Sequence, residues 1–139
     1  MVTGRNYTHL PGYWEGAYIA GPAAVIEPNA VIYGGVDPNK LYKIDTAGTL
    51  VATYDQASLA GWGWRDLAFD GVYLYASDSG TVQQIDPATG AATGVTIPSP
   101  INPARALAYD PATDHFWAAN WDSNLYEFDR TGKITVTLK

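Results

Sequence analysis

Aspartates that could bind a metal ion recur along this chain of 139 residues. The densest group is Asp110-Pro111-Ala112-Thr113-Asp114, and many of the others stand directly beside Pro, Gly or Ser. Calcium prefers oxygen ligands, but its common loop places carboxylates at alternate positions and closes with a Glu, and the chain has no such loop. Asp beside Pro or Gly also forms tight turns, because it accepts hydrogen bonds from its own backbone. We therefore interpret these aspartates as turn residues and predict no metal site.

The residues that most often catalyse reactions form no recognisable motif. His9 and His115 stand in different contexts, and neither has metal-ligand spacing with a second His or an acidic pair. The Gly-x-Ser-x-Gly elbow of a serine hydrolase, the phosphate loop and the dinucleotide fingerprint are all missing. The chain has no Cys, which excludes disulfides and thiolate ligands. The sequence predicts no catalytic residue, no cofactor and no metal.

The most unusual local feature is an aromatic and basic cluster, Gly61-Trp62-Gly63-Trp64-Arg65. An exposed Trp beside charged side chains can stack on a sugar ring or anchor a protein partner. The alternative is that Trp62 or Trp64 packs between two sheets. Arg105 begins the strand of the third repeat that is equivalent to the one after Arg65, and Trp121 and Asp122 lie together at a turn. The candidate ligand or partner surface therefore comprises Trp62, Trp64, Arg65, Arg105, Trp121 and Asp122.

Internal repeats indicate the elements that position these residues. Three segments alternate apolar and polar residues, as a strand does, and end in an Asp followed by a Gly at turn positions. Their aspartates, Asp45, Asp86 and Asp129, are 41 and 43 residues apart. Upstream, residues 65–70 match residues 105–110 at a spacing of 40, with a weaker copy at 24–28.

Each repeat contains two further strands, expected at 115–119 and 134–138 in the third repeat. The connections are short, so neighbouring strands run antiparallel. The turn before the third strand is matched as Asp78-Ser79-Gly80 and Asp122-Ser123-Asn124. A period of about 40–45 residues with four strands is typical of a propeller blade. A sandwich would not repeat the same order of turns three times. The predicted fold is all-β, a β-propeller of three four-stranded antiparallel blades.

The blades are expected at about residues 22–56, 63–98 and 103–139. Residues 1–21 form an N-terminal segment in which Tyr13–Ala20 alternates like a strand. Because sheet edges need covering, we predict that this segment pairs with an outer edge and locks a ring. The alternative is an outer strand left from a preceding blade.

The second and third repeats resemble blades of bacterial secreted propellers, in the broad class of quinoprotein-like and NHL-like repeats. The resemblance covers about residues 22–139, and the first blade departs from it by lacking the Arg of the inner strand. It implies a propeller fold and a location outside the cell or on its surface, although the chain shows no signal peptide. The matching segments are residues 65–71, 72–75, 85–90, 106–111 and 125–129.

The net charge of the chain and the number of its blades restrict the partners that we expect. The net charge of −6 disfavours nucleic acid and anionic membranes, and no apolar run of membrane-spanning length is present. Propellers have about four to eight blades, so three blades leave apolar sheet faces uncovered. We expect self-association, with two chains related by a two-fold axis forming a six-bladed ring. The alternative is a piece of a longer propeller.

Three functions fit these observations. The first is a non-catalytic module that closes a ring with itself and serves as a binding or scaffold domain for a glycan or a protein. The second is a propeller enzyme of quinoprotein or lactonase type with a site in the channel. That activity needs polar residues converging on the channel, where the inner strands here carry Ala, Leu, Phe and Tyr. The third is a propeller fragment without a ligand of its own.

Overall fold

The structure of the chain is a computed structural model that describes residues 31–34, 40–45, 47–56 and 63–139. Within these ranges the chain forms eleven β-strands arranged as three separate antiparallel sheets. None of the described segments is a helix long and apolar enough to cross a membrane. The predicted first strand of blade 1, at 24–28, and the predicted locking segment, 1–21, lie outside the described residues.

Blade 1 is described as a sheet of three strands in the order β1-β2-β3. The turn between β2 and β3 shows how Asp positions a reversal of the chain. Asp45 accepts hydrogen bonds from the backbone N–H groups of Ala47 and Thr49, at 2.9 and 2.8 Å. Gly48 follows with a φ of 87°, a value that L side chains rarely adopt. The strands are β1 (Val31–Gly34), β2 (Lys40–Asp45) and β3 (Leu50–Asp55).

Blades 2 and 3 each contain four strands in sequence order, joined by short connections. Blade 2 consists of β4 (Leu67–Phe69), β5 (Leu74–Ser77), β6 (Thr81–Ile85) and β7 (Ala92–Pro98). Blade 3 consists of β8 (Ala106–Asp110), β9 (His115–Ala119), β10 (Leu125–Phe128) and β11 (Ile134–Leu138). The prediction of four-stranded antiparallel blades is confirmed for both sheets.

The aspartates that the sequence marked as turn residues cap turns in the structure. Asp86 accepts the backbone N–H of Ala88, and Asp129 accepts those of Thr131 and Lys133. Each carboxylate thereby satisfies backbone donors that the turn leaves unpaired. Local turn chemistry accounts for their positions in the sequence.

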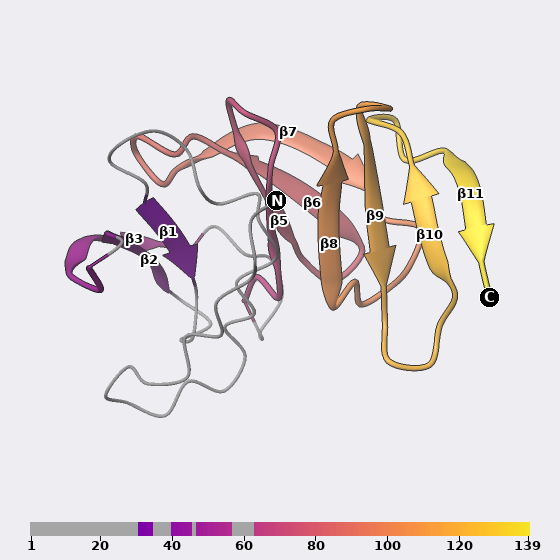
Figure 1. The fold of residues 1–139 in the computed structure, drawn as a ribbon, viewed down its shortest axis with the longest axis horizontal. Coiled ribbons are helices and arrows are strands. Elements are labelled where there is room, and N and C mark those ends of the chain that lie inside the picture. The colour runs from indigo at the N-terminus through magenta and orange to yellow at the C-terminus, as the bar shows by residue number, and fades with distance from the viewer. Residues whose placement is uncertain (1–30, 35–39, 46, 57–62) are drawn as a thin grey trace.

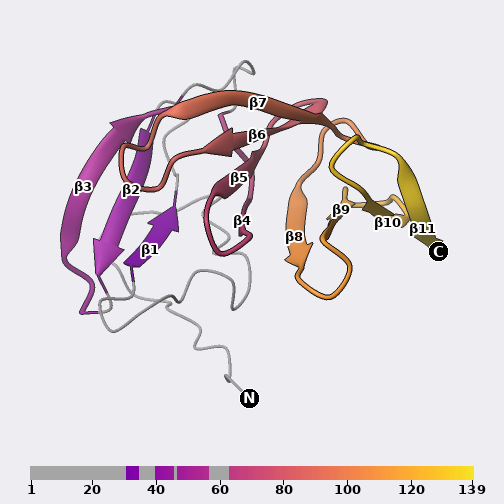
Figure 2. The same ribbon diagram turned by 90° about the horizontal axis from the view of Figure 1, so that it is seen from above.

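The three sheets follow one another along an arc (Figures 1 and 2). The inner strands β4 and β8 contact each other, whereas β3, β7 and β11 lie along the convex side (Figure 2). The apolar core lies between sheets rather than within one sheet. One cluster joins blades 1 and 2 and includes Leu41, Leu74 and Ile85, and a second joins blades 2 and 3.

Phe116 is the centre of the core between blades 2 and 3. Its ring has no exposed surface and lies 4.7 Å, centroid to centroid, from Tyr75 of blade 2. The rings of Tyr109 and Phe128 complete the aromatic group at 5.3 and 5.9 Å. Such tilted aromatic packing joins blades 2 and 3 through β5 and β9.

Candidate functional site

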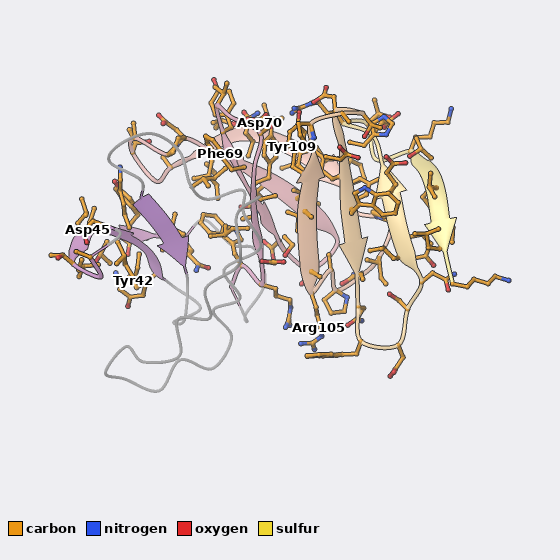
Figure 3. The ribbon with its side chains drawn as sticks, in the orientation of Figure 1. Tyr42, Asp45, Phe69, Asp70, Arg105 and Tyr109 are labelled. Atoms are coloured by element: carbon orange, nitrogen blue, oxygen red, sulfur yellow. The ribbon has the colours of Figure 1, made fainter. Side chains whose placement is uncertain are left out.

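Two arginines precede the inner strands of blades 2 and 3 in equivalent positions. The backbone N–H of Arg65 donates to the carbonyl oxygen of Ser77, and that of Arg105 donates to Ala119, both at 2.9 Å. The same backbone bond thus positions each arginine just before its inner strand, Arg65 two residues before β4 and Arg105 one residue before β8. Arg105 lies at the end of blade 3 opposite to Tyr109 (Figure 3).

The positive charge of Arg105 acts on Arg65. Burial lowers the pKa of Arg65, and the positive charge of Arg105 lowers it further, whereas the carboxylate of Asp78 raises it. The guanidinium carbon of Arg105 lies 5.7 Å from the centroid of the Trp121 ring. Trp121 is 71% exposed, so the ring leaves most of its surface open to solvent. We call this group, Arg65, Arg105 and Trp121, the arginine face.

The loops beside the two arginines differ in charge. In blade 2, Asp78 is buried and its Oδ1 accepts the backbone N–H of Ser79 at 2.8 Å. In blade 3, the Oδ1 of Asn120 accepts the backbone N–H of Trp121 in the same way, at 2.9 Å. The counterpart of Asp78 is therefore Asn120. The sequence comparison, which matched Asp78 with Asp122, was wrong at this point.

The remaining predicted surface residues are distributed differently. Trp64 is only 6% exposed, and its indole N–H donates to the side-chain oxygen of Gln83 at 3.0 Å. It packs in the core between blades 1 and 2, apart from the exposed surface of the arginine face. Asp122 is exposed in the β9–β10 loop next to Trp121. Trp62 lies outside the described residues.

A second surface, which the candidate residue set missed, is the face of blade 3 that points away from blade 2. Strand register pairs Ala108 with Trp117, and Leu125 with Leu138. Leu125 is 38% exposed and Leu138 50% exposed. We call these four residues the open face of blade 3. The sequence does carry a signal for this face. Successive residues of a strand point to opposite faces, and the strands of blade 3 have apolar residues on both faces.

The open face of blade 3 corresponds to a face of blade 2 that is covered. In blade 2, Ala68 pairs with Tyr75, and Val82 pairs with Ile97, in the same register. Each of these four side chains is 2% exposed or less, because blade 3 packs on them. The same positions are thus buried in one blade and exposed in the next.

Blades 2 and 3 are also joined by an arginine at the other end of the sheets. Arg130 binds the carboxylates of Asp114 and Asp70, at 2.6 and 3.0 Å, and the hydroxyl of Tyr75. Its guanidinium carbon lies 5.4 Å from the centroid of the Tyr75 ring. Asp70 and Asp114 are both paired with Arg130 in this way, so the cluster is a contact between blades 2 and 3.

Asp66 is a buried acid that joins the same two blades near the arginine face. Its Oδ2 accepts the backbone N–H of Leu107 from β8 at 2.7 Å, and its Oδ1 accepts that of Leu67 at 2.9 Å. Burial raises the pKa of this carboxyl from 3.8 to about 7, although both hydrogen bonds act to lower it. The carboxyl therefore titrates near neutral pH.

The described residues contain no group of three or more His, Asp or Glu side chains placed to hold a metal ion. Many of their acidic residues cap turns or pair with basic side chains, and the exposed chemistry of the arginine face is cationic and aromatic. Such a surface can bind an anionic or apolar group.

No family model matches the chain. The chain is 29% identical over 122 residues to THO complex subunit 6 of Arabidopsis thaliana, and this match covers 83% of the chain and 33% of the relative. The chain therefore spans about a third of the length of that curated relative.

Its structure is similar to the WD40 β-propeller domain of Doa1, with a TM-score of 0.59 and 11% sequence identity. This match covers 90% of the chain and 40% of that domain's chain. Together with the antiparallel blades, it confirms the prediction of an all-β propeller.

The comparisons do not confirm the narrower resemblance to bacterial quinoprotein-like or NHL-like propellers. The expected location outside the cell or on its surface is wrong, because of the similarity to THO complex subunit 6. The named relative is a subunit of the Arabidopsis THO complex and not an extracellular protein. The expectation had depended on the bacterial resemblance alone.

Proposed function

We propose that the chain is a non-catalytic β-propeller module that pairs with a second copy of itself to close a ring. The closed ring serves as a binding or scaffold domain, with a protein as the partner. Support for a protein partner comes from the two named proteins, one a subunit of a complex and the other a WD40 propeller domain.

The observation that carries this proposal is the match between the open face of blade 3 and the covered face of blade 2. Ala108, Trp117, Leu125 and Leu138 occupy the positions of Ala68, Tyr75, Val82 and Ile97. In blade 2 the ring of Tyr75 packs on Phe116 of the following blade. Trp117 is the equivalent aromatic of blade 3, so this face has the side chains that receive another blade.

Energetics favour covering the open face. Fully burying a Leu side chain contributes roughly 1.5–3 kcal/mol, so burying the exposed parts of Leu125 and Leu138 contributes on the order of 1 kcal/mol each. Trp117 is half-buried, and burying the exposed part of its ring adds to the favourable free energy of association. Because two-fold symmetry forms the same interface twice, the gain is doubled in a dimer.

A second copy is the occupant that closes the ring with a symmetric arrangement. Blade 3 of one copy would pack on blade 1 of its partner, and the second interface would repeat the first. Two sets of three blades make a six-bladed ring, within the usual range of propellers. The competing occupant is blades from a longer polypeptide or another protein.

Substitution on the open face tests this proposal. Leu138→Asp places a charge in the interface and should raise the dimer dissociation constant by roughly tenfold or more, measured by sedimentation equilibrium. The matched control is Val72→Asp, which changes a 63% exposed residue in the β4–β5 turn and should leave the constant unchanged. If Leu138→Asp associates as tightly as the unmodified chain, the open face is not the interface.

A further inference from the structure

We infer that the arginine face binds an acidic segment of a protein partner. A carboxylate of that segment lies at Arg105, and an apolar side chain beside it packs on Trp121. This inference deepens the proposed binding function and rests on it, but it does not depend on how the ring is closed.

The charge of Arg105 is the first argument. The carboxylate of Asp78 lies close enough to Arg65 to raise its pKa, whereas the equivalent position beside Arg105 holds the uncharged Asn120. Among the described residues, no carboxylate lies within ion-pair distance of Arg105. The repeat therefore places a carboxylate near one arginine and an uncharged amide near the other, in a protein whose net charge is −6.

Trp121 is the second argument. Trp121 is 71% exposed and its ring lies beside the guanidinium of Arg105, so most of its apolar surface is open to a partner. Trp and Arg are the residue types that most often dominate the energy of protein interfaces. The ring and the guanidinium are adjacent, so a segment with alternating acidic and apolar residues can contact both at once.

Two further observations restrict the ligand class. The neighbouring Arg65 lies close enough to Arg105 for the positive charge of Arg105 to lower its pKa, so two guanidinium groups share this surface. The exposed Asp122 follows Trp121 directly and would repel an extended polyanion along the loop. A single carboxylate with an apolar neighbour fits this surface better than a phosphate backbone.

The experiment uses a fluorescently labelled synthetic peptide of alternating Glu and Leu residues, with its Gln-for-Glu counterpart as control. Binding to the unmodified chain is followed by fluorescence anisotropy at two salt concentrations. We expect the Glu peptide to bind at least roughly tenfold more tightly than the Gln peptide, with an affinity that falls as salt rises.

Three variants assign that binding to the arginine face. Asn120→Asp keeps the hydrogen bond to the backbone of Trp121 and restores the charge found at Asp78, so it should weaken Glu-peptide binding roughly tenfold. Arg105→Gln should weaken it similarly. Lys133→Gln removes one charge from the β10–β11 turn at the opposite end of blade 3 and should leave binding unchanged.

The inference is overturned if both peptides bind equally, if Asn120→Asp binds as well as the unmodified chain, or if a single-stranded RNA oligonucleotide binds more tightly than the Glu peptide. Sedimentation of the same samples separates this outcome from failure of ring closure. A dimer that does not bind the Glu peptide refutes the acidic ligand alone. A monomer that binds it refutes self-association alone.

Discussion

Titration of Asp66 should make the stability of the chain depend on pH near neutrality. Asp66 is 7% exposed, and burial raises the pKa of its carboxyl from 3.8 to about 7. In the unfolded chain the same group titrates near its ordinary value. Between these two values the folded protein holds a proton that the unfolded chain has released. Stability from this group is therefore complete below about pH 4 and is lost as the pH rises through 7.

The size of the effect follows from the two pKa values of Asp66. One pKa unit corresponds to about 1.4 kcal/mol, and integration from pH 5 to pH 8 gives a fall of about 2.5 kcal/mol in the free energy of unfolding. Other described carboxylates with shifted pKa values move in the opposite direction and titrate below this range. They are Asp70, Asp114, Glu127 and Asp129.

The assay is urea unfolding followed by Trp fluorescence at pH 5 and pH 8, at one salt and one protein concentration. Asp66→Asn removes the titrating group, so the difference between the two pH values should shrink by about 2.5 kcal/mol. Asn accepts only one of the N–H groups of Leu67 and Leu107, so the variant is also less stable at pH 5. Asp122→Asn, at an exposed position, should keep the full difference. An equal pH dependence in Asp66→Asn and the unmodified chain would refute the reasoning.

Two further substitutions test how the blades pack. Phe116→Ala removes a ring without exposed surface and should lower the free energy of unfolding by about 3–5 kcal/mol in urea; a loss below about 1 kcal/mol would contradict tight packing of blades 2 and 3. Gly90→Ala should lower the melting temperature far more than Gly94→Ala. Both glycines have positive φ, but only at Gly90 would a new Cβ overlap the ring of Tyr54 from blade 1, so equal melting temperatures would disprove that contact.

Strand positions were predictable where local chemistry determines them. The strands expected at 115–119 and 134–138 match β9 and β11, because turn residues flank them on both sides. The strand expected at 65–70 is shorter in the structure, since β4 is Leu67–Phe69. Asp70 uses its carboxylate to bond the N–H groups of two following residues, and so the turn begins earlier than alternation suggests.

The candidate site was predictable only in part, because burial depends on contacts between blades. Nothing local distinguishes an exposed Trp from a buried one, and Trp64 packs against blade 1 while Trp121 stays exposed. The equivalence of Asp78 and Asn120 could also not be predicted from the sequence. The β9–β10 loop is longer than its counterpart, and matching by residue type paired Asp78 with Asp122.

The most direct test is the mass of the unmodified chain in solution, measured by light scattering after size-exclusion chromatography over a range of protein concentrations. Association through the open face of blade 3 predicts a particle of twice 14.9 kDa that dissociates on dilution. A stable, soluble particle of 14.9 kDa at every concentration would contradict it, because the open face would then remain in contact with water.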